Sequence, residues 1–303
     1  MSSTLRINGP ARVIGDITLP GDKSISHRVA MLASIAGGTS RITGFASSAD
    51  CQATLDCIEK LGIPLRYAPG EIAIEGRGLD GFDVPAEPVQ LWAGNSGSTI
   101  RMISGLLAGA SISSQIDGDS SLRRRPMRRI LEPLRLMGAQ IEAREDNFPP
   151  LFISGRQLKP ISYQSPIASA QIKTCVLMAG LQASGNTTFV EPTQSRDHTE
   201  LMLPVFGLPV SIKQTAGGQK LSIEGGRELS PVNYHVPGDL SSAAFFIAAA
   251  VLAQGSRLNI KEVGLNPTRS GFLDVLGRLG ATISRSNIRH SAGEAYGDLA
   301  IAP

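Results

Sequence analysis

Apolar residues recur at helical spacing in four places along the chain, each time after a loop of small residues. These segments are PGDKSISHRVAMLASIAGG, GNSGSTIRMISGLLAG, SPIASAQIKTCVLMAGLQASG and PGDLSSAAFFIAAAVLAQG, and they close at Gly37, Gly109, Gly185 and Gly255. Each predicts a helix that is apolar on most of its circumference and is therefore buried. The closing glycines lie roughly 70 residues apart, which indicates an internal repeat.

A second set of helical patterns runs in phase with the first. It comprises SSADCQATLDCIEKLG, RRPMRRILEPLRLMG, SRDHTELMLPVFG and NPTRSGFLDVLGRLG, which close at Gly62, Gly138, Gly207 and Gly280. Between the two helices lies a short β-type run, and after the second comes an alternating stretch broken by turn residues, which predicts a hairpin. The repeating unit is therefore helix, strand, helix and hairpin, and we expect a left-handed C-cap at each closing glycine.

The amino-acid composition excludes several classes of function. The chain has 303 residues, enough for two domains, and 42% hydrophobic with 18% charged residues is typical of a soluble globular protein. A net charge of +3 and 5% aromatic residues argue against nucleic-acid binding. Three cysteines without metal-ligand spacing suggest neither a disulfide framework nor a zinc site and favour the cytoplasm. Neither a signal peptide nor a membrane span is expected, because the most apolar segment, near 240–255, fits a buried helix.

The loops of small residues present free backbone N–H groups at helix N-termini, where the dipole favours anions. Ordinary N-capping by Ser24, Ser96, Ser169 and Asp239 explains each loop taken alone. Lys23 and Arg28 change that balance, because cations in the first turn of a helix oppose its dipole. An anionic ligand would account for both side chains.

Five arginines crowd the sequence SSLRRRPMRRILEPL, directly before a predicted helix. Pro126 suits the first helical turn, so Arg125 lies at the helix mouth and is the candidate anion ligand. The other four fit a solvated face or local ion pairs, for example with Glu132. Arg196 repeats the pattern in SRDHTE. We interpret five further residues as structural, namely Cys51, Cys57, Cys175, His27 and His198.

Seven motifs together resemble the 5-enolpyruvylshikimate-3-phosphate (EPSP) synthase family over the whole chain. They are PGDKSISHR, GNSGSTIR, RRRPM, SAQIK, SRDHTE, VPGDLSSAAFF and NPTRSGFLDVL, and they occur in the order and spacing of that family. The resemblance implies an α/β fold, the inverse α/β barrel of βαβαββ units in two similar domains with the active site between them. Residues 20–235 would form the N-terminal domain, and residues 1–19 with 236–303 part of the second.

The resemblance also implies an enzyme of the shikimate pathway, which makes aromatic amino acids. It transfers the enolpyruvyl group of phosphoenolpyruvate to the 5-hydroxyl of shikimate 3-phosphate, without a cofactor or metal, and a cytoplasmic monomer is expected. Lys23 would be catalytic and would contact both substrates. The residues implied to bind shikimate 3-phosphate are Ser24, Arg28, Ser169, Gln171 and Arg196, and those implied to bind phosphoenolpyruvate are Asn95, Gly97 and Arg125. Gly97 also implies sensitivity to the inhibitor glyphosate.

This sequence departs from the family pattern in three places. Ser98 and Ala170 stand where many or some members have Thr and Ser. More importantly, the repeat predicts four units, whereas the family has six, and its acid-base aspartate comes from the later ones. We therefore expect a C-terminally truncated chain that does not turn over alone.

Two other functions remain open at this point. The related enolpyruvyl transferase that acts on UDP-N-acetylglucosamine shares the fold, but it typically carries a catalytic cysteine where DGDSSLRRRPM has none. A non-catalytic or RNA-processing relative would use the arginine run on phosphates and would bind in a strongly salt-dependent manner.

Overall fold

The computed structural model describes residues 12–303, and these divide into two compact units. The larger unit is Lys23–Val236. The smaller one joins the segment that ends at Asp22 to Pro237–Pro303. The smaller unit is therefore built from two stretches of chain that the whole of the larger unit separates.

Two series of helices occupy the predicted positions. The first series is α1 (Lys23–Ser34), α3 (Gly97–Gly109), α5 (Ala170–Leu181) and α7 (Leu240–Leu252). The second is α2 (Ala49–Lys60), α4 (Arg128–Leu136), α6 (His198–Val205) and α8 (Gly271–Arg278), with a short 3₁₀ turn, η1 (Leu122–Arg124), before α4. The repeat that the sequence predicts is confirmed.

The predicted glycine caps are confirmed in the second series only. The four glycines that close it adopt φ of 87° to 99°, the left-handed region in which a Cβ is disfavoured. In the first series Gly37 already opens a strand, and Gly109 is still the last residue of α3. The prediction was wrong for these two positions. Gly185 and Gly255 have positive φ, of 122° and 76°, but they lie beyond the helix ends, because α5 ends at Leu181 and α7 at Leu252.

Sixteen strands form four sheets of four strands each within the described residues. They are β1 (Ile14–Thr18), β2 (Gly37–Thr43), β3 (Leu65–Ala68), β4 (Glu71–Arg77), β5 (Val89–Trp92), β6 (Ser113–Asp117), β7 (Gln140–Arg144), β8 (Phe148–Ser154), β9 (Ser162–Gln164), β10 (Asn186–Glu191), β11 (Ser211–Thr215), β12 (Gly218–Glu224), β13 (Asn233–His235), β14 (Arg257–Gly264), β15 (Thr282–Ser291) and β16 (Glu294–Ala302). In every sheet a hairpin lies antiparallel to the strand between the two helices, and one parallel strand completes the far edge.

The completing strand comes from an unexpected place in two of the four sheets. β5 pairs with β6 and β9 pairs with β10, as simple βαβ units would have it. In contrast, β13 pairs in parallel with β2, and β1 pairs in parallel with β14. The strand that precedes α7 thus closes the sheet that follows α1, and the strand that precedes α1 closes the sheet that follows α7.

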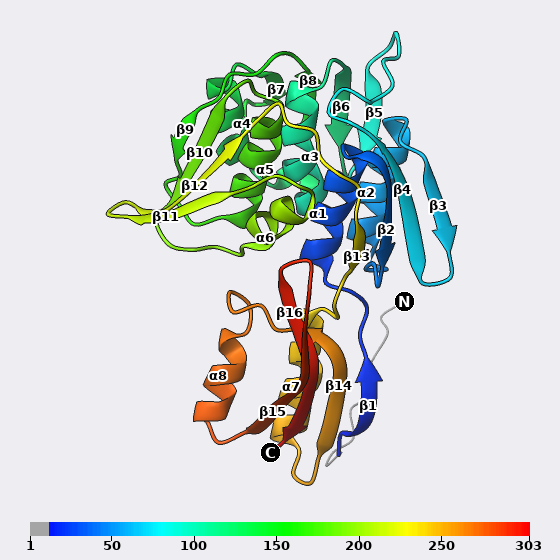
Figure 1. Ribbon diagram of the computed structural model, residues 1–303, viewed down its shortest axis with the longest axis vertical. Helices are drawn as coiled ribbons and strands as arrows, with labels where there is room; N and C mark the ends of the chain where they lie inside the picture. The colour runs from blue at the N-terminus through cyan, green and yellow to red at the C-terminus, as the bar shows by residue number, and fades with distance from the viewer. Residues whose placement is uncertain (1–11) are drawn as a thin grey trace. The chain divides into compact units, whose positions relative to one another are not determined.

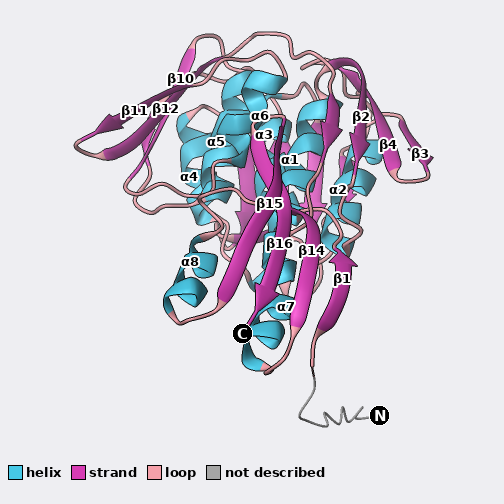
Figure 2. Ribbon diagram, turned by 60° about the horizontal axis from the view of Figure 1, so that its bottom comes forward, coloured by secondary structure: helices cyan, strands magenta, loops and turns pink. Residues whose placement is uncertain are grey.

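Helices form the interior of the larger unit, and the sheets lie outside them. All residues of α1 after Ser24 are buried, as are all residues of α5 from Ile172 onward. Figure 1 and Figure 2 both show α1, α3 and α5 packed together, with β10–β12 on one side and β2–β4 on another. This arrangement explains why α1, α3 and α5 are apolar on nearly every side. It also gathers the N-termini of these three helices within one unit.

The smaller unit has its own core, in which α7 and α8 pack on the sheet β1-β14-β16-β15. Only Leu240, Ala243, Ile247 and Ala250 of α7 are buried, whereas Phe245 is 80% exposed. The prediction of a fully buried helix was therefore wrong for one face, because a single sheet covers only the other. None of the helices in the described region has the length and apolar character that a membrane crossing requires.

Candidate functional site

Three first-series helices of the larger unit begin beside polar side chains that the sequence singled out. Ser96 caps α3 by accepting a hydrogen bond from the Thr99 amide, at 3.1 Å. Ser169 caps α5 in the same way. α1 instead begins at Lys23, so Ser24 lies inside the first turn and the predicted capping role was wrong.

Ser24 makes a contact that links two repeats. Its hydroxyl oxygen accepts a hydrogen bond from Arg196 Nη1 at 3.3 Å, although the two residues lie 172 positions apart. Arg196 itself is exposed, in the loop between β10 and α6. Two residues that were predicted to hold the same substrate are therefore neighbours at the mouth of α1.

Arg28 lies beneath this mouth and is only 3% exposed. Its guanidinium donates to the Ser24 carbonyl at 2.8 Å, to the Ala170 carbonyl at 3.3 Å and to the hydroxyls of Thr199 and Thr174, both at 2.9 Å. Arg28 thus ties the starts of α1, α5 and α6 together. Direct contact of Arg28 with a substrate stays a prediction, but its role in holding the site together is evident.

Gln171 connects α5 to the start of α3. Its amide nitrogen donates to Ser98 Oγ at 3.1 Å, and its carbonyl oxygen accepts from Arg101 Nη1 at 3.0 Å. Arg101 also donates to the carbonyls of Gly97, at 3.4 Å, and Pro126, at 3.2 Å. One buried guanidinium therefore joins α3, α5 and the arginine-rich loop before α4.

Arg125 and Asn95 face each other at the start of α3. Arg125 Nη2 donates to Asn95 Oδ1, and Asn95 Nδ2 donates to Asp119 Oδ2 at 2.6 Å. This amide hydrogen bond is the main reason that the pKa of Asp119 lies below its ordinary value. The carboxylate thereby orients the amide, which in turn orients the guanidinium.

The other arginines of the run serve different purposes. Arg123 donates to Asp117 from Nε, 3.0 Å from both carboxylate oxygens, and from Nη2 to Oδ2, in a bidentate pair that fixes the loop to β6. The local ion pair expected for this run is therefore formed, with Asp117 as the partner rather than Glu132. Arg124, Arg128 and Arg129 are exposed, in agreement with a solvated face.

Gly97 leaves room that any side chain would fill. A Cβ at this position would lie 2.7 Å from Arg101 Nη1 and 3.2 Å from Arg125 Nη1. Backbone N–H groups at the start of α3 and two guanidinium groups thus border the same small space. Such a combination is suited to binding a phosphate or a carboxylate.

The electrostatics of the site favour an anion. Burial, followed by repulsion from Arg129 and Arg125, lowers the pKa of Arg101 to about 10. That repulsion would be relieved by a negatively charged ligand among these side chains. Lys23, whose side chain is 46% exposed, forms an ion pair with Asp50 at 3.0 Å. Its ammonium group therefore remains accessible to a ligand at the mouth of α1.

The histidines and cysteines have the predicted structural environments. His27 is fully buried, and its Nδ1 lies 2.7 Å from Thr54 Oγ1. Burial raises the pKa of the Cys57 thiol to about 12 and also raises that of Cys175. These thiols are packing groups rather than nucleophiles.

Arg101 is the site residue that the sequence analysis missed. It stands four positions after Gly97 in the run GSTIRMISGLLAG, where it is the single charge in an otherwise small and apolar helix. A charge in such a setting signals either a buried partner or a ligand. The interpretation of this segment as a packing helix concealed that signal.

The comparisons with known proteins agree on one family. The family model described as EPSP synthase (3-phosphoshikimate 1-carboxyvinyltransferase) matches residues 7–299. This chain belongs to the EPSP synthase family. The 3-phosphoshikimate 1-carboxyvinyltransferase of Solibacter usitatus is 51% identical over 296 residues, which are 98% of this chain and 68% of that protein. The Bacillus subtilis protein of the same name is 48% identical over 288 residues, or 95% of this chain and 66% of that protein.

Solved structures give the same result. The structure of EPSP synthase from Acinetobacter baumannii matches with a TM-score of 0.87 and 43% sequence identity. The match covers 97% of this chain and 65% of the Acinetobacter chain. The predicted family and the predicted α/β fold are confirmed, and the enzyme named in these matches is the predicted one. The chain spans about two thirds of the length of the EPSP synthases that it matches.

Proposed function

We propose that this chain acts in the transfer of the enolpyruvyl group of phosphoenolpyruvate to the 5-hydroxyl of shikimate 3-phosphate, with release of phosphate. The observation that carries the proposal is the continuous set of contacts at three helix starts. Arg196 donates to Ser24, and Arg28 donates to the carbonyls of Ser24 and of Ala170 in α5. Arg101 donates to Gln171 and to the Gly97 carbonyl. A site of this kind suits substrates that carry both a phosphate and a carboxylate.

Shikimate 3-phosphate would lie at the starts of α1 and α5. The side chains of Ser24, Ser169 and Gln171 are partly exposed there, and that of Arg196 is exposed, so all four can reach a ligand. Arg28 would act mostly through its bonds to the Ser24 and Ala170 carbonyls, which hold the two helix starts in register. The hydroxyl and amide groups supply hydrogen bonds, and Arg196 supplies the charge.

Phosphoenolpyruvate would lie at the start of α3. Asn95 and Arg125 border that position, and the absence of a side chain at Gly97 lets the anion approach the backbone N–H groups. The buried Arg101 adds positive potential without needing to reach the ligand. Phosphoenolpyruvate carries a carboxylate and a phosphate, so the density of guanidinium groups matches its charge.

Lys23 would act between the two substrates. In the addition step the 5-hydroxyl gives up its proton as its oxygen forms a bond to C2 of phosphoenolpyruvate, and C3 takes up a proton as the C2–C3 double bond becomes single. In the elimination step the bond from C2 to the phosphate oxygen breaks, and C3 loses a proton. The ammonium group of Lys23 would stabilise the negative charge of the phosphate in both steps and assist proton movement. Asp50, at 3.0 Å, would orient it.

The remaining expectations belong to the same proposal. Residues 20–235 would serve as the N-terminal domain, with 1–19 and 236–303 as part of the second, in a monomeric cytoplasmic enzyme. The partners would be the two small-molecule substrates, with no nucleic acid, membrane, metal or organic cofactor involved. The segregation of the arginines into site, ion-paired and solvated groups supports a small-anion site over a nucleic-acid surface.

Calorimetric titration of shikimate 3-phosphate into the chain tests the proposal. We expect saturable binding that Arg196→Ala weakens by about 10- to 100-fold, because charge-assisted hydrogen bonds contribute roughly 1.5–3 kcal/mol. Arg66→Ala is the matched control, since Arg66 is an exposed arginine paired with Glu75 on the outer sheet. No binding by a cooperatively folded sample, or equal losses in both variants, would refute the proposed site.

A further inference from the structure

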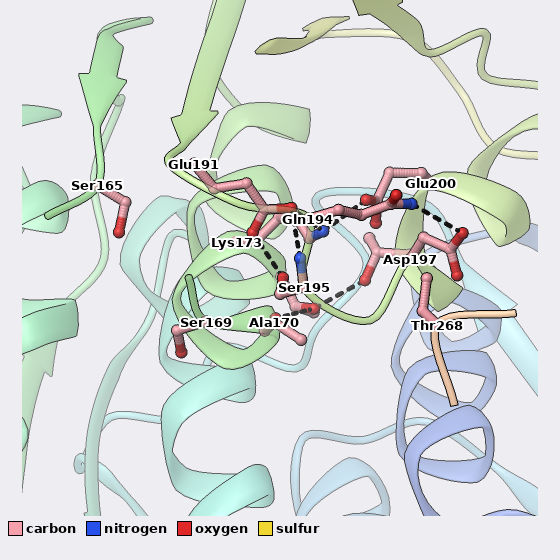
Figure 3. Close-up of polar contacts among 12 residues, drawn as sticks. Ser165, Ser169, Ala170, Lys173, Glu191, Gln194, Ser195, Asp197, Glu200 and Thr268 are labelled. Atoms are coloured by element: carbon pink, nitrogen blue, oxygen red, sulfur yellow. Dashed lines mark hydrogen bonds and ion pairs between the residues drawn. The ribbon is translucent and has the colours of Figure 1, made fainter. Parts of the chain in front are cut away.

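Lys173 lies completely inside the protein, on the helix that begins at the proposed substrate site. It is 0% exposed, four residues after the α5 cap Ser169. Its Nζ is 2.7 Å from Glu191 Oε1 and 2.6 Å from Glu200 Oε1, and both carboxylates are buried as well. Figure 3 shows the three side chains together with the loop that connects β10 to α6. None of the three was predicted to belong to the site.

Burial of three charged groups lowers the free energy of unfolding, so such a cluster calls for a functional explanation. Desolvation of an ammonium and two carboxylates costs several kcal/mol per ion, and hydrophobic residues of equal volume usually serve stability as well or better. One carboxylate would already neutralise Lys173. The second leaves Glu200 Oε2 without a hydrogen bond to the described residues, and burial raises the Glu200 pKa. Stability alone therefore does not account for the arrangement.

The geometry indicates what the arrangement holds in place. Glu191 is the last residue of β10, and its carboxylate also accepts two hydrogen bonds from Ser195, from the amide at 3.0 Å and from the hydroxyl at 2.6 Å. One carboxylate thus bridges the buried ammonium and the residue immediately before Arg196. The loop 192–197, which carries Arg196 between β10 and α6, is fastened at its centre.

We propose that Lys173, Glu191 and Ser195 form a clamp that positions Arg196 for the anionic substrate. The clamp rests on the proposed function and extends it. Lys173 belongs to the same helix as Ser169 and Gln171, so the clamp places the arginine relative to the start of α5. Glu200 joins the first turn of α6 to the same ammonium and so fixes the far end of the loop. Lys173, Glu191 and Ser195 are positioning residues, and none of them needs to touch the substrate.

Rigidity is what such a clamp contributes to binding. An exposed arginine on a free loop would lose side-chain and backbone entropy when it captured a ligand, whereas a fastened loop has lost the backbone part already. The contact of Arg196 Nη1 with Ser24 Oγ at 3.3 Å shows the arginine directed toward the α1 start.

A double-mutant cycle between Ser195 and Arg196 tests the clamp. Ser195→Ala removes one hydrogen bond to Glu191 and keeps the fold, so it should weaken shikimate 3-phosphate binding by about fivefold. In the Arg196→Ala background the same substitution should change the affinity by less than about twofold, because its effect passes through the arginine. An unchanged affinity in Ser195→Ala, or an equal loss in both backgrounds, would overturn the proposal.

The control is Ser222→Ala, which removes a hydroxyl hydrogen bond to Thr188 of the same strand β10, at 2.9 Å, away from the loop. It should lower stability by a similar amount and leave the affinity unchanged. A parallel loss of affinity in this control would reduce the Ser195 effect to general destabilisation and refute the clamp.

Hydrogen exchange of the free protein separates the clamp from the proposed function. In Glu191→Gln and Ser195→Ala the amides of residues 193–197 should exchange at least about tenfold faster than in the wild type, with those of α5 unchanged. If the wild type binds no shikimate 3-phosphate, the proposed function fails, and the exchange data still decide whether the loop is clamped. Unchanged exchange in both variants would rule the clamp out.

Discussion

Replacement of Gly97 by Ala tests how closely the anion site is packed. The new Cβ would meet Arg101 Nη1 at 2.7 Å, a separation that real Cβ atoms do not tolerate, and Arg125 Nη1 at 3.2 Å. Arg101 cannot yield freely, because it is only 7% exposed and is held by Gln171 at 3.0 Å and the Pro126 carbonyl at 3.2 Å. The methyl group must therefore displace a guanidinium that the proposed phosphoenolpyruvate site depends on.

The magnitude follows from the bonds at risk. Displacement of Arg101 Nη1 breaks its bonds to Gln171 and to the Gly97 carbonyl, and a charge-assisted hydrogen bond contributes roughly 1.5–3 kcal/mol. Overpacking itself costs about 1–3 kcal/mol of stability. We expect phosphoenolpyruvate affinity to fall by about 10- to 100-fold, at 1.4 kcal/mol per tenfold. Glyphosate affinity should fall at least as far, since the methyl group fills part of the same space.

The assay is calorimetric titration of phosphoenolpyruvate, and of glyphosate, in the presence of saturating shikimate 3-phosphate. Affinity for shikimate 3-phosphate should fall less than that for phosphoenolpyruvate, because Gln171 is the proposed ligand of that substrate that contacts the displaced Arg101. Gly277→Ala in α8 is the matched control, since a Cβ there meets nothing within 4 Å. Equal affinities of wild type and Gly97→Ala for phosphoenolpyruvate and glyphosate would refute the placement of the pocket.

Three further predictions concern buried and exposed groups. Lys173→Met leaves Glu191 and Glu200 buried without a cation and should lower the free energy of unfolding, measured in urea at pH 7, by about 3–5 kcal/mol. The loss should become smaller toward pH 5, because protonation then removes the buried charge, and a loss that does not depend on pH would contradict this. The Cys57 thiol should react with maleimide only after unfolding, because burial raises its pKa to about 12. Since this folded pKa lies above the ordinary value of 9.0, the contribution of the thiol to stability is complete below pH 9 and is lost as the pH rises toward 12, and Cys57→Ala should abolish that pH dependence. Leu252 is 85% exposed on α7, so Leu252→Lys should raise the solubility limit and change the free energy of unfolding by no more than about 0.5 kcal/mol. A larger loss of stability would mean that Leu252 packs more than its exposure indicates.

Much of the candidate site was predictable because its chemistry is local. Loops of small residues before apolar helices indicate anion-binding helix starts, and a cation in such a turn, as at Lys23, indicates a ligand. Lys173 illustrates the limit of this reasoning. A lysine among small and apolar residues could face solvent or the interior, and its partners Glu191 and Glu200 lie 18 and 27 positions away. No local pattern determines such a pairing.

The sequence by itself determined the repeat, because hydrophobic periodicity and terminating glycines act within a few residues and recur with each unit. It also determined the types of elements and their order. Only the tertiary structure decided which sheet each edge strand completes. Asn233 lies opposite Arg41 and Ile14 opposite Arg257, so that β13 and β1 are exchanged between two otherwise equivalent positions. The hydrogen bonds are the same in either arrangement, and the choice depends on which sheet edge the folded chain brings near each strand.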